Sequence, residues 1–259
     1  MLKYTSNLHE GADYISMMER QTPFAVSLAL NRTAAAIHQA INAEMPRVFD
    51  RPTPYTLRGL RVVRSSKDNL TARVDFRDAP GSGIAADRYL APQVYGGGRS
   101  RKRFEHALER VSSGGYFVPG AGAELDAYGN MSRGQLVRVL SYLQAFGEQG
   151  YRANATARTR KRAAKMGKSE GGHRRINGVV YFVSRGKGSM SGNREQRLPA
   201  GVWRKSGTHG ADVKPVLLAV DAPTYAPLLS FYETADEVYA ERFDSEFEAA
   251  ISHAMATAR

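Results

Sequence analysis

Apolar residues recur every three or four positions in some stretches of the chain, as in a helix, and every second position in others, as in a strand. The points where this period changes mark the boundaries of the expected elements. Between residues 23 and 45 apolar side chains recur every three or four positions, which predicts an amphipathic helix. Thr22 is placed to cap its start, and Pro23 falls in the first turn, where a missing N–H costs nothing. Pro46 is expected to end the helix, because the residue before a proline is disfavoured in the helical region.

A stiff joint follows this helix in the stretch "FDRPTPYTLRGLRVV", residues 49–63. Pro52 and Pro54 each fix one φ angle and disfavour helix for the preceding residue. We therefore expect the chain to leave the helix in an extended form, with the two prolines setting the angle between helix and sheet. Apolar residues then alternate from residue 57 to residue 76 on both sides of the polar turn "SSKDN", which predicts a β-hairpin.

The remaining pattern adds strands and helices in an irregular order. Strands are expected at "GYFVP", at residues 178–184, near Trp203 and at residues 213–220, whereas "YLAPQV" is expected to be extended. Helices are expected around "RFEHAL", after a capping box formed by Ser132 and Gln135, and from residue 228 to residue 258.

This order of elements is not the regular strand–helix alternation of a parallel sheet. It predicts an α+β fold with a mainly antiparallel sheet packed against amphipathic helices, a long C-terminal helix and a flexible basic loop. The expected organisation is an N-terminal arm over residues 1–22 and one α+β domain over residues 23–259, which carries a basic flexible insertion at residues 151–178.

Charge is distributed unevenly along this outline. The net charge is +12, and residues 151–178 hold nine Lys or Arg against one Glu. Residues 221–259 hold eight acids against two arginines. Such asymmetry indicates a nucleic-acid partner, an acidic protein surface, or self-association of basic on acidic regions.

The basic insertion allows three interpretations. It is a solvated loop, it binds DNA without sequence preference because it has no aromatic residue between Arg152 and Ile176 to stack on bases, or it contacts the acidic C-terminal helix of a neighbouring subunit. The candidate DNA- or partner-contacting residues are Arg158, Arg160, Lys161, Arg162, Lys165, Lys168, Arg174 and Arg175. The candidate acidic residues of a subunit interface are Glu237, Glu241, Asp244 and Glu248.

No pattern predicts catalysis, a metal site or a cofactor. The chain has no cysteine and its six histidines are scattered, so zinc ligation has no support. The triple glycine Gly96–Gly98, followed by a basic run, could cradle a phosphate, although a flexible turn is the simpler interpretation. A metal-dependent nuclease using the pairs Asp75 and Asp78, or Glu105 and Glu109, is a weaker alternative, because neither pair is distinctive in its spacing.

No uncharged apolar run is long enough to span a membrane, and the N-terminus lacks the apolar region of a secretory signal. Several segments together resemble a family of virion proteins from tailed phages and prophages, of the minor tail protein Z, or tail-completion, type. They include "ALNRTA", "FDRPTPYTLRGL", "YLAPQVYGG", "LDAYGNMSRGQL" and "LPAGVW", in this order. The resemblance covers residues 23–258, and "RPTPYT" and "YGNMSRGQ" are its most specific blocks.

The resemblance implies a structural, non-enzymatic protein at the head–tail junction or the top of the tail, present as a ring or a few copies. Implied partners are other virion proteins of the connector, tail or collar, further copies of itself and genomic DNA in the channel, with no membrane and no cofactor. It implies location in the virion after assembly in the bacterial cytoplasm. In such a ring, Pro52 and Pro54 would hold the packing helix rigidly against the sheet. The alternative is a sequence-non-specific DNA-binding protein acting in packaging.

Overall fold

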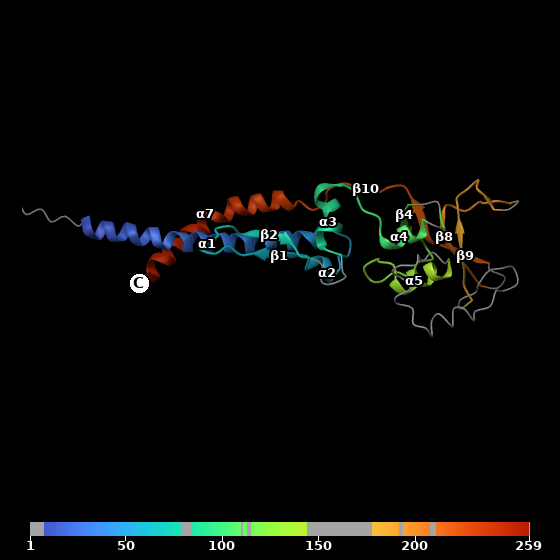
Figure 1. Ribbon diagram of the computed structural model, residues 1–259, viewed down its shortest axis with the longest axis horizontal. Coiled ribbons are helices and arrows are strands. Elements are labelled where there is room, and N and C mark those ends of the chain that lie inside the picture. The colour runs from blue at the N-terminus through green and yellow to red at the C-terminus, as the bar shows by residue number, and fades with distance from the viewer. Residues whose placement is uncertain are drawn as a thin grey trace, which may run out of the picture. The chain divides into compact units, whose positions relative to one another are not determined.

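The computed structural model describes residues 8–78, 84–109, 111–112, 115–143, 178–191, 194–207 and 211–258. The chain forms two compact units: unit 1 comprises Met1–Gly96 and Tyr225–Arg259, and unit 2 comprises Gly97–Thr224 (Figure 1). The sequence analysis expected one domain from residue 23 onward. Instead, the contacts divide the chain so that unit 2 is inserted between the two segments of unit 1.

Unit 1 is built on two long helices, α1 (Leu8–Val48) and α7 (Phe231–Thr257). Figure 1 shows α7 running alongside α1, and four fully buried alanines form the centre of their contact: Ala25, Ala29, Ala250 and Ala254. The helices are antiparallel, because Glu44 near the end of α1 accepts hydrogen bonds at the start of α7, from the Ser230 amide at 3.0 Å and the Thr234 hydroxyl at 2.9 Å. This carboxylate also complements the positive end of the α7 dipole.

The predicted start and end of the first helix are wrong, because Pro23 and Pro46 both lie inside α1. The Thr22 hydroxyl does not cap a helix start but donates to the Met18 carbonyl at 2.7 Å, one turn earlier. A proline inside a helix removes one backbone hydrogen bond and costs about 3 kcal/mol. Burial of Ala25 and Ala29 against α7 offsets that cost, so residues 8–22 continue α1 where a separate arm was expected.

The alanine contact leads to a stability prediction. We expect Ala250→Leu to destabilise unit 1 by about 1–3 kcal/mol, because a fully buried small residue between two helices leaves no room for three further carbons. Ala249→Leu is the matched control, since Ala249 is exposed on the same helix and its replacement should change stability by less than about 0.5 kcal/mol. Urea unfolding followed by helical circular dichroism measures both. Equal losses in the two variants would contradict the prediction.

The proline joint contains a helical turn rather than a fully extended segment. α2 (Pro54–Leu57) begins with Pro54, and the Thr53 hydroxyl caps it by accepting from the Thr56 amide at 3.2 Å. Proline suits the first position of a helix, because its missing N–H would have no intrahelical partner there. The expected extended exit is therefore wrong for residues 54–57, and Pro52 precedes the cap.

The predicted hairpin is confirmed. β1 (Leu60–Val63) pairs antiparallel with β2 (Arg73–Phe76), from Leu60 opposite Phe76 to Val63 opposite Arg73. α3 (Ala86–Tyr95) follows where an extended segment was expected at "YLAPQV". Leu90 and Pro92 of α3 are both buried, so packing outweighs the helix penalty of the proline. The core joining these elements to α1 and α7 contains Ile41, Met45, Leu60, Leu90 and Leu229.

Unit 2 is a four-stranded antiparallel sheet in the order β4-β9-β8-β5. Its strands are β4 (Tyr116–Pro119), β5 (Val180–Ser184), β8 (Gly201–Ser206) and β9 (Asp212–Val220). The short pair β6 (Met190–Ser191) and β7 (Arg194–Glu195) lies between β5 and β8 in the sequence. β3 (Gly97–Gly98) pairs with β10 (Thr224–Tyr225) where the chain enters and leaves the unit.

Two helices of unit 2, α4 (Arg103–Leu108) and α5 (Arg133–Tyr142), contribute to the same core as the sheet. Its buried members include Leu108 of α4, Leu140 of α5 and Val202 of β8. The Ser132 half of the predicted capping box is confirmed, as its hydroxyl accepts from the Gln135 amide at 3.4 Å. The Gln135 side chain instead binds the Glu124 amide at 2.7 Å, which ties the preceding loop to α5. The predicted α+β class, antiparallel pairing and long C-terminal helix are thus confirmed.

Candidate functional site

Charge is divided between the two units. Unit 1 carries 14 Lys and Arg against 16 Asp and Glu, whereas unit 2 carries 23 against 9. The formal net charges are therefore −2 and +14. The sequence analysis found the basic and acidic segments, and the structure assigns them to two separately packed bodies.

The acidic residues predicted for a subunit interface form one continuous stripe on α7. The spacing of four, three and four residues places them on one face of the helix, and all are exposed: Glu237, Glu241, Asp244 and Glu248. We call this set the acidic stripe. None of the four is ion-paired with a residue that the structure describes, whereas Glu246 on the opposite face pairs with Arg32 at 3.3 Å.

Repulsion within the acidic stripe has an energetic consequence. Like charges three or four residues apart on a helix destabilise it by about 0.2–0.5 kcal/mol per pair. Pairs at these spacings recur along the whole stripe, from Glu237 to Glu248. A partner that brings cations to this face would remove the repulsion and gain attraction at the same time. The stripe is therefore a surface that favours a basic partner.

The predicted basic contact residues lie outside the described residues: Arg158, Arg160, Lys161, Arg162, Lys165, Lys168, Arg174 and Arg175. The same holds for the whole predicted insertion except Gly178. Exposed cations of unit 2 that the structure does describe include Arg103, Arg133, Arg194, Arg197 and Lys205. These residues come from α4, α5, β7, the segment after β7, and β8. The positive charge of unit 2 therefore extends well beyond the predicted basic insertion.

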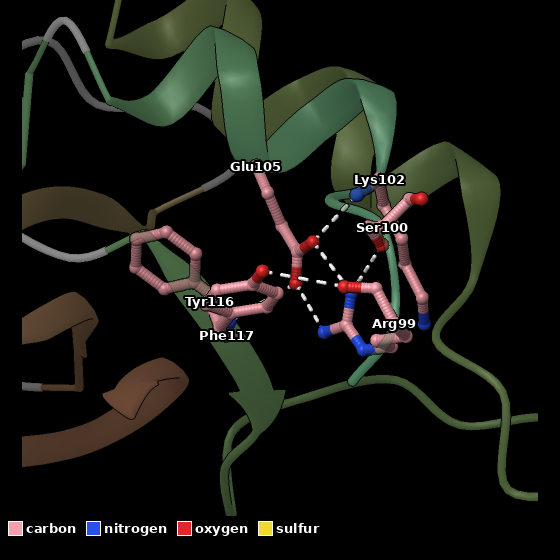
Figure 2. A network of polar contacts seen from close by, with 6 residues as sticks. All are labelled: Arg99, Ser100, Lys102, Glu105, Tyr116 and Phe117. Atoms are coloured by element: carbon pink, nitrogen blue, oxygen red, sulfur yellow. Dashed lines mark hydrogen bonds and ion pairs between the residues drawn. The ribbon is translucent and has the colours of Figure 1, made fainter. Parts of the chain in front are cut away.

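Two arginines of the basic run after the triple glycine, Arg99 and Arg101, are engaged in internal contacts, and Figure 2 shows those of Arg99. Glu105 of α4 is fully buried and accepts two hydrogen bonds from the Arg99 guanidinium, at 2.6 and 2.7 Å. It also accepts from the backbone amides of Lys102 at 2.6 Å and Phe117 at 3.1 Å. Arg101 pairs with Glu109 at 2.8 Å. Sequence reasoning missed this network, although a glutamate in the first turn of a helix is a recognisable capping signal.

The network fixes the charge state of Glu105. Burial alone would raise the pKa of its carboxyl group, but the Arg99 guanidinium and the amides of Lys102 and Phe117 outweigh burial, so the pKa lies below its ordinary value. The guanidinium carbons of Arg99 and Arg101 also lie 5.0 and 5.6 Å from the centre of the Tyr116 ring. These contacts lock α4 onto β4 and leave the two arginines engaged, which disfavours a phosphate cradle at this turn.

The acidic pairs considered for a nuclease have arginine partners. Asp78 pairs with Arg61 at 2.8 Å, and Asp75 lies 3.8 Å from Arg73. Glu105 is held by Arg99 in the network of Figure 2, and Glu109 pairs with Arg101. Within the described ranges, no three His, Asp or Glu side chains are placed to share a metal ion.

Comparison with known proteins adds no relationship. No protein family, curated protein or solved structure matches this chain. Among the helices that the structure describes, none combines the length and the apolar character needed to cross a bilayer.

Proposed function

We propose that the protein is a structural component of a tailed-phage virion, at the head–tail junction or the top of the tail, where it assembles as a ring or in a few copies. The observation that carries the proposal is the division of charge between the units, together with the exposed acidic stripe on unit 1. The basic unit 2 of one copy can face the acidic stripe of the next. Such a head-to-tail contact uses different surfaces of each copy, which is the interface type that generates rings.

The sequence resemblance to minor tail proteins of the Z type supports the same assignment. In that family the chain would contact connector, tail or collar proteins in the virion and would have no catalytic task. Complementary surface potentials give partner orientation and association rate more than raw affinity. An assembly contact of this kind is therefore expected to weaken as salt rises, since the screening length is about 10 Å at 0.1 M.

Quantitative mass spectrometry of purified particles tests the assignment directly. Particles of the source phage or of an induced prophage should contain peptides of this chain at a handful to a dozen copies, which is the stoichiometry expected of a closed ring or of a component present in a few copies. Absence from intact particles would overturn the structural assignment.

Reversal of the acidic stripe tests the interface. We expect the triple variant Glu237→Lys, Glu241→Lys, Asp244→Lys to weaken self-association at low salt by at least about tenfold, a loss of about 1.4 kcal/mol spread over three desolvated or rim contacts. Sedimentation velocity over a concentration series measures it. The matched control reverses Glu10, Asp13 and Asp236, three exposed acids of unit 1 outside the stripe. If the control variant weakened self-association as much as the stripe variant does, the net charge of the protein would explain the effect and the acidic stripe would not.

Sequence-non-specific DNA binding is the second candidate, and the charge of +14 on unit 2 favours it. It requires that the isolated chain binds duplex DNA with a steep salt dependence, with a log–log slope of roughly −7 if the eight net charges of residues 151–178 all contact phosphates. Charge reversal of Arg158, Arg160, Lys161 and Arg162 would then abolish DNA binding and leave self-association intact. The virion assignment predicts incorporation into particles whether or not the isolated chain binds DNA.

A further inference from the structure

The sheet of unit 2 has an edge at β5. In the order β4-β9-β8-β5, this strand pairs with β8 on one side, and no other described strand pairs with it. An edge strand presents a row of backbone N–H and C=O groups that can pair with a further strand. β5 is five residues long, which is the usual length of a strand in a globular protein.

A groove of about 680 Å³ follows this edge. All five residues of β5 line it, together with Tyr142 and Leu143 at the end of α5, residues 194–198, and Lys205 of β8. Tyr181 belongs to the core that α4 and α5 share with the sheet, and alternation along the strand places Phe182 on the opposite face. Because residues of both faces line it, the groove wraps around the open edge of the strand rather than covering one face of the sheet.

The groove combines apolar walls with cations that form no ion pair within the described part of the chain. Arg194, Arg197 and Lys205 are exposed in it, and none is ion-paired with another described residue. Glu195 is the single acid among the described residues that line it. Apolar contacts would come from Leu143, Val180, Phe182 and Leu198, and the charge is that of a site for an acidic ligand.

We propose that the β5 groove binds an acidic segment of a partner protein in extended conformation, which adds to the sheet as a further strand beside β5. Backbone pairing along the edge would supply affinity, and alternate side chains would supply specificity, as in other cases of strand addition. Acidic side chains of the segment would meet Arg194, Arg197 and Lys205, and its apolar side chains would pack against Phe182 and Leu198.

The chemistry of the groove argues for this occupant over two others. Residues 144–177 of the chain carry nine Lys or Arg against two Glu, so their composition does not complement the three cations of the groove. A single-stranded nucleic acid would match the charge. Of the aromatic residues that line the groove in the described part of the chain, Tyr181 is buried in the core and Tyr142 packs edge-on against it, which leaves Phe182 for base stacking. The open edge of β5 instead offers backbone hydrogen bonds that suit a peptide.

Fluorescence anisotropy on the full chain tests the proposal. The probe is a fluorescein-labelled octapeptide of alternating Glu and Val, and we expect Arg194→Glu combined with Arg197→Glu to weaken its binding at least about tenfold. The matched control, Arg103→Glu with Arg133→Glu, reverses two exposed arginines of α4 and α5 that do not line the groove, and should leave the affinity within about twofold of wild type. Loss of binding in both double variants would overturn the site.

Two further measurements separate strand addition from simple charge attraction. An octapeptide of the same sequence with alternate backbone nitrogens methylated should lose binding, because it cannot donate to the β5 edge. Hydrogen exchange at residues 180–184 should slow when the unmodified peptide is added. Equal affinity of the methylated peptide, or binding of labelled octathymidine to the groove in place of the peptide, would overturn the proposal. Both readouts use the isolated chain, so their outcome is independent of whether the chain is found in virions.

Discussion

Replacement of Glu105 by glutamine is expected to destabilise unit 2 by about 3–5 kcal/mol, because it removes the charge of a fully buried carboxylate that accepts hydrogen bonds from the Arg99 guanidinium and from two backbone amides. The Arg99 side chain is only 16% exposed and donates two hydrogen bonds to Glu105 (Figure 2). Trp203 of β8 is the only tryptophan of the chain. Urea unfolding followed by tryptophan fluorescence therefore reports on unit 2 separately.

The exposed pair Arg101–Glu109 supplies the matched control for this prediction. It lies on the same helix and loop, but its side chains are 34% and 54% exposed. Glu109→Gln should therefore cost at most about 1 kcal/mol, the usual range for solvent-exposed ion pairs. If the two glutamine variants lost equal stability, burial of Glu105 would not be the source of the effect.

The same carboxyl group makes unit 2 sensitive to acid. The folded pKa of Glu105 lies below the value of about 4.3 expected in the unfolded chain. Because the unfolded state then binds the proton more readily, the stabilisation is fully present above the unfolded pKa and is lost as pH falls through the lower folded pKa. We expect wild type to lose more stability than Glu105→Gln between pH 5 and the folded pKa. Parallel losses in both proteins would assign acid sensitivity to other groups.

Replacement of Gly201 by alanine is expected to destabilise unit 2 by about 2–6 kcal/mol. Gly201 has φ 147°, a conformation that side-chain-bearing residues rarely adopt, which costs about 1–3 kcal/mol. A Cβ there would collide with the Leu217 carbonyl oxygen and lie 3.0 Å from the Leu218 Cα. Overpacking of this kind adds about 1–3 kcal/mol, and neither β9 atom can move without disturbing the sheet.

A second variant, Gly178→Ala, separates the cost of conformational strain from the cost of the steric clash. Gly178 also has positive φ, at 78°, but a Cβ there would meet no atom of the described residues within 4 Å. Gly178→Ala should therefore show only conformational strain, about 1–2 kcal/mol. Trp203 fluorescence during urea unfolding measures both variants, and the excess cost in Gly201→Ala is the steric part. An excess near zero would mean that β8 and β9 separate easily at this point.

The spacing of apolar residues was sufficient to predict an element where that pattern lies entirely within the element itself. The helices α5 and α7, the β1–β2 hairpin and the strand β9 all follow from apolar spacing. It failed where packing overrode a local rule, at Pro23 and Pro46 in α1 and Pro92 in α3. A proline penalty is visible in the sequence, whereas the alanine contact with α7 that offsets it joins residues more than 200 positions apart.

The candidate sites show the same limit. The acidic stripe could be predicted, because helical spacing within a single element decides which side chains share a face. The β5 groove could not, since it combines residues from α5, β5, the segment 194–198 and β8. The division into two units was also hidden, because it depends on the long-range pairing of α1 with α7.

That pairing also sets the timing of folding during translation. α1 is synthesised early, yet the first residue of α7 follows its last by roughly 180 positions, which takes about 10–40 s at ribosomal rates of about 5–20 residues per second. All of unit 2 is synthesised before the first residue of α7. The face of α1 that carries Ala25 and Ala29 therefore remains without its partner helix for the whole time that unit 2 is being synthesised.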